Sequence, residues 1–378
     1  MKIQKPFKTE PDFEHFRKVV TRETKKGPVP LVELFADPEI MAEATGVDFP
    51  ADGWMKLNNI DVRSSKEEEI EFITLGIKYM DLCVEFSKAV GYDYVTAIPI
   101  IPFPRSVQFL KSNPQQQGKV RVWQNEHQGS ISSPGDIDKY PWPAPEQVSL
   151  FPIDYIAAKM PQGMKVMAFL IGVFEYLRLL VGFEAMAIKS IEEPELLAEI
   201  LERLTRVMEI ATDKIAAHPA VGAVFYGDDM GFNQGLMMSP KWFRANLFPR
   251  QKRIADACKK HDKPFLFHAC GNVDAVMNDL INTVGITAKH AFQDNIEPVE
   301  KFYQRHHDRI SILGGIDVNL LAAGNPDQVR DRTRQVLEAC APSGGLCIGT
   351  GNSVTNYCKI ENYYAMIDTV REWNERHS

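Results

Sequence analysis

Cysteine is scarce in this chain: six cysteines occur among 378 residues, between Cys83 and Cys358. Small secreted domains held by disulfides need a much denser set at compact spacing. The cysteines are therefore expected to be free thiols or metal ligands in a reducing compartment. No uninterrupted apolar stretch reaches the ~18 residues of a membrane helix, and the first residues lack the apolar centre of a signal peptide. We expect a cytoplasmic protein with no membrane partner.

An excess of positive charge is also lacking. Lys and Arg number 43 against 50 Asp and Glu, which gives a formal net charge of −7 at pH 7. A nucleic acid or an anionic membrane surface would require the opposite balance. No Gly-x-Ser-x-Gly sequence marks a nucleophilic serine, and Gly349-Thr-Gly-Asn352 lacks the spacing of a nucleotide-binding loop. Serine hydrolysis and nucleotide binding are therefore not indicated.

The sequence does contain short apolar runs that alternate with segments of helical periodicity. Several runs are almost entirely apolar, which is typical of parallel strands covered by helices. The predicted strands are residues 30–35, 94–99, 165–171, 222–227, 264–267, 286–291, 310–314 and 346–349. Eight such units predict a single α/β domain over residues 1–378, a (β/α)8 TIM barrel with an N-terminal extension and an insertion after strand 2. The length alone would also accommodate two average domains.

The insertion covers residues 100–162, which is too long for an ordinary connection between a strand and a helix. It is rich in proline and aromatic residues, as in Tyr140-Pro-Trp-Pro-Ala-Pro145, and has no clear periodicity. A disordered linker would normally contain fewer aromatic residues. We expect an ordered excursion over one face of the barrel, which is a substrate lid, a dimer surface or a purely structural insertion.

Polar residues gather directly after the predicted strands. In a barrel, the carboxyl ends of the strands meet at the face that carries the chemistry. Burying many ionisable groups without partners would be costly, so we expect these side chains to share one polar pocket. The candidates are Glu33, Glu175, Asp228, Asp229, His268, Cys270, His290, Asp294, Asp317, Asn319, Asn352, Ser353 and Asn356.

His268-Ala-Cys270, after the run 264–267, places two soft metal ligands at the predicted mouth of the barrel. If the two residues alternate in the strand register, their side chains lie on the same face, close enough to bind one ion. Zinc needs at least a third protein ligand, and Cys347 is the best distant candidate. The alternative is that Cys270 and Cys347 are small buried hydrophobic residues and that His268 is a core histidine.

Asp228-Asp229 follows the fourth predicted strand and should share the mouth with His268. Because successive residues of an extended chain point to opposite sides, only one of the two should face the pocket. We expect Asp229 to face it, where it would handle a proton or orient His268, and Asp228 to support the turn. Either aspartate could instead cap a helix or a turn.

Taken in order, these motifs resemble the uroporphyrinogen decarboxylase superfamily, which contains decarboxylases and zinc-dependent corrinoid methyltransferases. The resemblance spans most of the chain. It rests on Gly227-Asp-Asp-Met-Gly231 with Ser239-Pro-Lys-Trp-Phe-Arg244, on His268-Ala-Cys-Gly-Asn272, on Leu313-Gly-Gly-Ile-Asp317, and on Gly349-Thr-Gly-Asn-Ser353 with Glu361-Asn-Tyr363.

Two features favour the methyltransferase branch. The decarboxylases carry an arginine-rich N-terminal segment for a polycarboxylate substrate, whereas Glu33 occupies that region here and would repel such a substrate. A His-x-Cys pair followed much later by a second cysteine is similar to the zinc motif of the methyltransferases. The last cysteine of that motif falls slightly later than Cys347, so Glu175 or Asp229 is an alternative third ligand.

The resemblance implies methyl transfer between a small substrate and the cobalt of a corrinoid (cobalamin) carried by a separate partner protein, with zinc as a Lewis acid. The substrate would be a methoxylated aromatic, another small methyl donor or a thiol acceptor. A decarboxylase-like lyase acting on a carboxylated substrate and a binding protein without catalysis are the alternatives. Under any of these functions the protein could form a homodimer. The implied roles are zinc binding by His268, Cys270 and Cys347, catalysis by Asp228, Asp229 and Glu175, and substrate binding by Glu33, His290, Asp317, Asn319 and Asn352.

Overall fold

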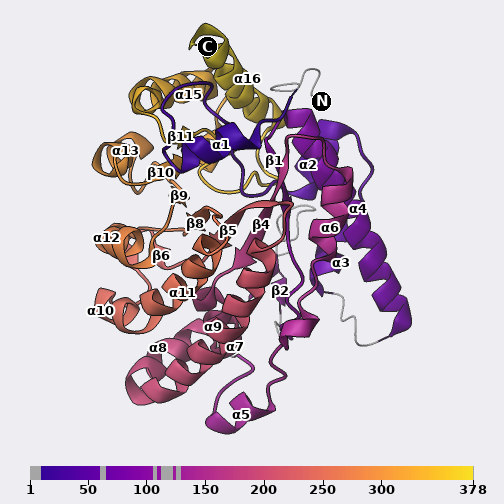
Figure 1. Ribbon diagram of the computed structural model, residues 1–378, viewed down its shortest axis with the longest axis vertical. Helices are drawn as coiled ribbons and strands as arrows, with labels where there is room; N and C mark the ends of the chain where they lie inside the picture. Colours follow the sequence, from indigo (N-terminus) through magenta and orange to yellow (C-terminus); the bar gives the residue numbers. More distant parts are fainter. Residues whose placement is uncertain (1–9, 60–64, 105–108, 112–121, 125–128, 378) are drawn as a thin grey trace.

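The centre of the molecule is a curled sheet of seven parallel strands (Figure 1). The computed structural model describes residues 10–59, 65–104, 109–111, 122–124 and 129–377. Neighbouring strands follow the order β1-β4-β5-β8-β9-β10-β11, and every neighbouring pair is parallel. These strands are β1 (Tyr94–Ala97), β4 (Lys165–Ile171), β5 (Val221–Gly227), β8 (Phe265–His268), β9 (Ala288–His290), β10 (Ser311–Leu313) and β11 (Leu346–Cys347).

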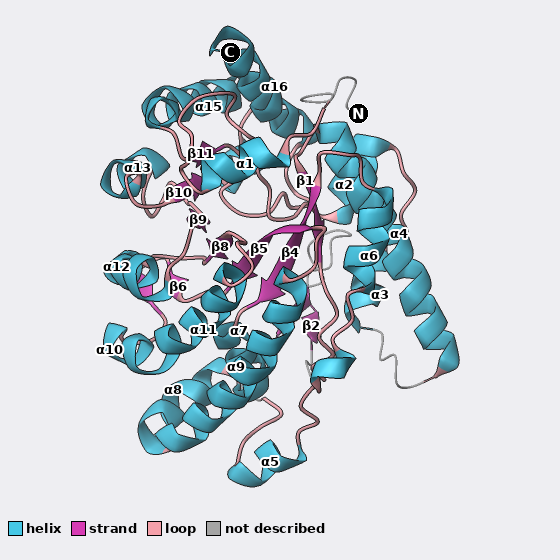
Figure 2. Ribbon diagram, viewed as in Figure 1, coloured by secondary structure: helices cyan, strands magenta, loops and turns pink. Residues whose placement is uncertain are grey.

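Helices surround this sheet (Figure 2). Many begin with the expected signals; α15, for example, starts at Pro326 after an Asn325 side chain that caps the Gln328 N–H. Among the described residues, no helix is long and apolar enough to cross a membrane. The helices are α1 (Phe13–Val20), α2 (Pro38–Thr45), α3 (Gly53–Asn59), α4 (Lys66–Val90), α5 (Pro134–Lys139), α6 (Phe151–Lys159), α7 (Val173–Val181), α8 (Phe183–Glu192), α9 (Pro194–Ala216), α10 (Pro240–Trp242), α11 (Phe248–Lys259), α12 (Met277–Asp279), α13 (Val299–His306), α14 (Val318–Ala323), α15 (Pro326–Cys340) and α16 (Ile360–His377).

The predicted strand at residues 30–35 is where the structure differs from the prediction. This segment makes only isolated bridges, such as the parallel bridge between Leu31 and Ile348. On its other side, the hydroxyl group of Tyr94 in β1 accepts the Glu33 N–H at 2.6 Å and donates to the Glu33 carbonyl at 2.7 Å. A side chain therefore occupies the backbone donor and acceptor that a ladder to β1 would need. The segment joins β1 through Tyr94, and the predicted eighth strand does not form.

Helix α1 covers the amino-terminal ends of the strands. The Phe13 N–H donates to the Gly163 carbonyl just before β4, and the Ser311 hydroxyl in β10 donates to the Val19 carbonyl. Phe16 is fully buried among inward-facing strand residues. Apolar packing fills this end of the sheet, so the opposite ends of the strands are left to carry polar chemistry.

Within the predicted excursion at residues 100–162, an antiparallel bridge joins Ile100 to Ser149. Between these points the chain includes the hairpin of β2 (Phe109–Lys111) and β3 (Val122–Gln124), followed by α5. The Ile131 N–H donates to the Leu180 carbonyl, which ties the segment to α7. Residues 151–159 form α6, which contacts β1 and β4 as an ordinary barrel helix. Residues 105–108, 112–121 and 125–128 of this range lie outside the described residues.

Candidate metal centre

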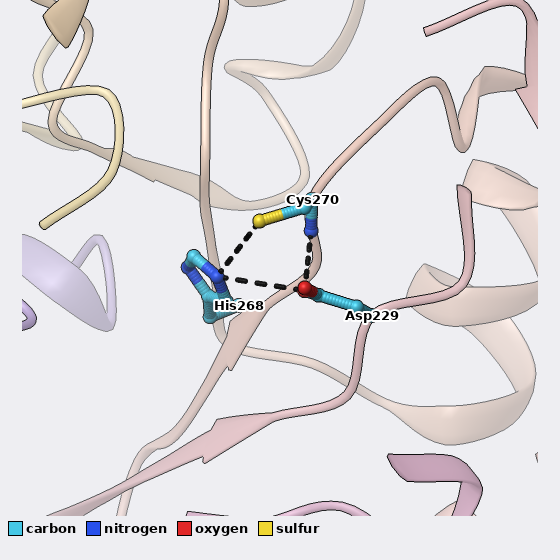
Figure 3. A group of neighbouring side chains, drawn as sticks. All are labelled: Asp229, His268 and Cys270. Atoms are coloured by element: carbon cyan, nitrogen blue, oxygen red, sulfur yellow. Dashed lines mark hydrogen bonds and ion pairs between the residues drawn. The ribbon is translucent and has the colours of Figure 1, made fainter. Parts of the chain in front are cut away.

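Three side chains from two neighbouring strand ends converge at the carboxyl end of the sheet (Figure 3). His268 ends β8 and pairs in register with Gly227, the last residue of β5, so Asp229 and Cys270 continue from the same level. The imidazole Nε2 of His268 lies 3.3 Å from the Cys270 sulfur and 3.5 Å from the Asp229 carboxylate. One ligand atom from each residue lies within 4.8 Å of the others. The spacing permits all three to bind one ion.

Asp229 and Asp228 point in different directions, as their alternation predicts. The Asp229 carboxylate faces the group and accepts the Cys270 backbone N–H at 2.7 Å. Asp228 is fully buried and points toward the start of α7, where it accepts the Glu175 N–H at 2.9 Å. Burial raises the pKa of Asp228 to about 6, although hydrogen bonds oppose the shift. Its side chain supports the fold beneath the site.

Gly172 allows this close approach of Asp228 to α7. A Cβ atom at this position would lie 2.1 Å from the Asp228 Cγ, far inside van der Waals contact. The Tyr226 hydroxyl and the Gln251 side-chain amide also donate to the Asp228 carboxylate, at 3.2 and 2.8 Å. Buried carboxylates are stable only when their oxygens are satisfied in this way.

The hydrogen bonds around His268 define which ring nitrogen carries the proton. His290 Nε2 lies 3.1 Å from the Thr350 carbonyl oxygen, which can only accept, so Nε2 must be protonated. His290 Nδ1 is then an acceptor, and His268 Nδ1, 2.8 Å away, must donate to it. Burial lowers the pKa of both rings, which keeps them neutral. His268 therefore presents an unprotonated Nε2 to Cys270 and Asp229, as a metal ligand would.

Cys270 completes the donor set with its sulfur. Burial and the neighbouring Asp229 charge raise the pKa of its thiol well above the usual range. The Asn352 side-chain amide donates to the same sulfur at 3.3 Å. A bound cation would reverse the pKa shift, because a coordinating thiol is deprotonated. Thiolate, imidazole and carboxylate together match the ligands that zinc prefers, so the residues fit this metal.

Cys347 lies elsewhere. It is fully buried in β11, inside the apolar cluster that includes Phe16 and Leu313. Burial raises its thiol pKa well above the usual range. Among the described residues, the group that could hold a metal contains Asp229 in place of Cys347.

Glu175 lies next to the metal-binding group but outside it. Its carboxylate pairs with Arg178 at 3.0 Å, and Arg178 also approaches the Asp229 carbonyl at 3.4 Å. Burial raises the pKa of Glu175, and the Arg178 charge opposes this shift. Glu175 and Arg178 are therefore close enough to Asp229 for their charges to act on its carboxylate.

Asn352, whose side-chain amide donates to the Cys270 sulfur, also lines a cavity of about 340 Å³. Of the residues predicted to bind substrate, Asp317, Asn319 and Asn352 line it, whereas Glu33 and His290 do not. Both Asp317 oxygens already accept backbone amides, from Asp294 and Asn319, each at 2.7 Å. The aromatic side chains that line the cavity are Phe35, Trp54, Tyr79, Phe292 and Tyr357.

Sequence reasoning missed two polar residues of this region, Thr350 and Lys289. Thr350 gave no signal, because its contacts with His290 and Glu33 span 60 and 317 positions of the chain. Lys289 lies in the middle of the predicted strand at residues 286–291, where a cation is unusual, and this placement was a usable signal. Its ammonium group is buried, donates to the Ala291 carbonyl at 2.6 Å and lies 4.4 Å from the Phe292 ring centre. Burial lowers its pKa to about 8.

The fold and the site together define a class: an α/β protein with parallel strands whose carboxyl ends bring together a candidate metal-binding group. The family model for uroporphyrinogen decarboxylase (URO-D) matches residues 127–373. The chain belongs to this family, as its sequence motifs indicated.

Among solved structures, the chain is similar to a methyltransferase from Methanosarcina mazei, with a TM-score of 0.64 and 18% identity over 94% of this chain and 98% of that one. This likeness shows a shared fold. Xylanase TsXylA from Thermoanaerobacterium saccharolyticum (TM-score 0.31, 11% identity, 66% and 73% covered) is too distant to support an inference. The same holds for a GH27 β-L-arabinopyranosidase from Geobacillus stearothermophilus (0.37, 11%, 93% and 77%). A comparison with curated protein sequences finds no match.

Proposed function

We propose that this protein is a zinc-dependent methyltransferase that moves a methyl group between a small substrate and the cobalt of a corrinoid on a partner protein. The observation that carries the proposal is the convergence of Asp229, His268 and Cys270 beside a cavity. Membership of the uroporphyrinogen decarboxylase family and the fold shared with a methyltransferase support it.

The three side chains would hold zinc with one position left for substrate. Bound zinc would act as a Lewis acid that makes an ether oxygen a better leaving group or lowers the pKa of a thiol. His268 offers its unprotonated Nε2, and the Asn352 amide donates to the Cys270 sulfur. Asp229 accepts the Cys270 N–H and so also fixes the loop that carries the sulfur.

The cavity favours a methoxylated aromatic among the substrates considered. Its aromatic side chains, Trp54 and Tyr79 among them, offer flat apolar surfaces that suit an aryl ring. Its polar side chains are mostly amides and hydroxyls, such as those of Gln293 and Ser353, which suit phenol and ether oxygens. No lysine or arginine occurs among the described residues that line it, which disfavours a substrate with several carboxylates.

Methyl transfer can be measured directly. The zinc-loaded protein would be mixed with a methoxyphenol and a corrinoid-binding protein reduced to Co(I), and methyl–cobalt formation followed by its visible spectrum. We expect transfer by the unaltered protein and a loss of roughly 10²-fold or more in a His268→Ala, Cys270→Ser double variant. Transfer at an unchanged rate by the double variant or by the metal-free protein would contradict the proposal.

A decarboxylase-like lyase is the second candidate, favoured by family membership alone. It predicts release of CO₂ from a carboxylated substrate without zinc. The same preparations, incubated with a panel of aromatic and aliphatic carboxylates and assayed for CO₂, separate the two functions.

A further inference from the structure

We infer that Glu33, acting through Thr350, is a positioning residue that holds two of the three candidate zinc ligands in their binding geometry. The inference rests on the zinc site of the proposed function. Glu33 itself touches none of Asp229, His268 and Cys270 in any recorded contact. It lies behind them, 4% exposed, in the segment that Tyr94 joins to β1.

The first route runs from Glu33 to His268. The Glu33 carboxyl group accepts the Thr350 N–H at 3.3 Å and also contacts the Thr350 hydroxyl. These two contacts hold Thr350 in place, its carbonyl oxygen accepts His290 Nε2–H, and His290 in turn accepts His268 Nδ1–H. Each step permits one direction of donation only. The chain ends with a lone pair on His268 Nε2, where the metal would bind.

Gly314 makes this route sterically possible. It has a φ of +92°, and a Cβ atom there would lie 2.3 Å from the Thr350 carbonyl oxygen and 3.2 Å from His290 Nε2. Glycine is the residue that tolerates this φ and leaves room for the contact between His290 and Thr350.

The second route runs from Glu33 to Cys270. The Thr350 hydroxyl contacts both the Glu33 carboxyl group and the Asn352 carbonyl oxygen. A hydroxyl has one hydrogen and a carbonyl oxygen can only accept, so Thr350 donates to Asn352 and receives a hydrogen from a protonated Glu33. Asn352, held by its carbonyl oxygen, directs its side-chain amide to the Cys270 sulfur at 3.3 Å. One buried acid thus supports both the imidazole and the thiol.

The test compares Glu33→Leu with Glu33→Gln. Glutamine can donate to the Thr350 hydroxyl and accept the Thr350 N–H, as the protonated acid does, whereas leucine keeps similar volume and can do neither. We expect zinc affinity, measured by chelator competition, to fall about 10- to 100-fold in Glu33→Leu and to stay within about threefold in Glu33→Gln. Unchanged affinity in Glu33→Leu, or an equal loss in both variants, would overturn the inference.

Thr350→Val provides a second variant if Glu33→Leu does not fold. It removes only the hydroxyl, and we expect a weaker loss of zinc affinity because the backbone route to His290 remains. The matched control is Thr333→Val, which deletes another buried hydroxyl, bonded to the Val329 carbonyl at 2.7 Å in α15. Equal zinc affinities in Thr350→Val and Thr333→Val would count against the route to Cys270.

Nitrogen NMR of the imidazoles in the metal-free protein gives a readout without activity. We expect His268 to be the Nδ1–H tautomer in the unaltered protein and in Glu33→Gln, and a mixture of tautomers in Glu33→Leu. A single unchanged tautomer in Glu33→Leu would contradict the route through His290. If the protein bound no zinc, the proposed function would fail, while this measurement would still decide what Glu33 does.

Discussion

Asp228 and Asp229 are adjacent in sequence, yet their carboxylates have different surroundings. Asp228 is enclosed by donors from α7, β5 and α11, and Asp229 faces His268 and Cys270. Strand alternation was enough to predict this difference, because the Asp228 N–H continues the β5 ladder by donating to the His268 carbonyl at 2.9 Å. Alternation did not identify the third member of the candidate metal group: we predicted Cys347 with Glu175 or Asp229 as alternatives, and the structure brings Asp229 to His268 and Cys270.

Replacing Asp228 and replacing Asp229 by asparagine should affect different properties of the protein. Asp229→Asn should weaken zinc binding and reduce methyl transfer by roughly 10²-fold, with the free energy of unfolding little changed. Asp228→Asn should instead lower the free energy of unfolding by about 2–3 kcal/mol, because an amide NH₂ would face donors that now point at a carboxylate. Denaturant unfolding and a zinc titration of both variants provide the comparison; loss of zinc from Asp228→Asn alone would reverse the assignment.

Glu33 should make stability depend on pH. Burial raises its pKa from 4.5 to about 8. An acid whose pKa rises on folding stabilises the fold fully below the unfolded pKa, and this contribution is lost as the pH increases through the folded pKa. Between pH 4.5 and 8 the free energy of unfolding should therefore fall more in the unaltered protein than in Glu33→Gln. The difference should be on the order of a few kcal/mol, and parallel pH profiles would contradict it.

At the scale of elements, the apolar runs predicted all seven strands of the sheet to within a few residues. They also predicted a strand at residues 30–35, where none forms. An apolar run indicates that a segment is buried, but it does not indicate which groups form hydrogen bonds with its backbone N–H and carbonyl groups. For Glu33 this hydrogen-bond partner is the hydroxyl of Tyr94. The two residues lie 61 positions apart in the sequence, so no local pattern predicts the contact.

Tyr94→Phe tests this connection. Removing the hydroxyl leaves the Glu33 N–H and carbonyl without a partner from β1, so the free energy of unfolding should fall by about 2–3 kcal/mol. Tyr303→Phe is the matched control, because that buried hydroxyl also donates to a backbone carbonyl, that of Gly344, at 2.6 Å. Equal losses in the two variants, measured by urea unfolding, would show that Tyr94 has no special role.

At the scale of the whole molecule, the sequence predicted which side chains meet at the strand ends. It did not predict the contact between Glu33 and Thr350 that we propose holds them in place. His268, Cys270 and Asp229 follow from a parallel sheet in which consecutive units are neighbours. Thr350 and Glu33 lie 317 positions apart, and their contact depends on how the first segment meets the last strand. The stretch at 100–162 was recognisable as longer than an ordinary connection, but its composition did not reveal α6 at its end, which packs on β1 and β4 as a barrel helix.

Zinc should stabilise the entire fold. A ligand that binds only the folded state adds free energy by mass action, about 2.7 kcal/mol at a free concentration 100 times its Kd. We therefore expect the thermal midpoint of the unaltered protein to rise on zinc addition and that of the His268→Ala, Cys270→Ser double variant to stay constant. Calorimetry with and without zinc provides the measurement, and an equal shift in both proteins would place the bound metal elsewhere.

The hydrogen bond from the Glu33 N–H to the Tyr94 hydroxyl also determines how fast this backbone amide should exchange its hydrogen with solvent. The Glu33 amide is protected by one side chain, whereas amides in β5 lie between two paired strands. Displacement of the one Tyr94 side chain would expose that amide, while a β5 amide needs two paired strands to separate. In deuterium oxide, the Glu33 amide should therefore exchange before those of β5. Its rate would report how often the segment proposed to support the candidate zinc ligands separates from the sheet.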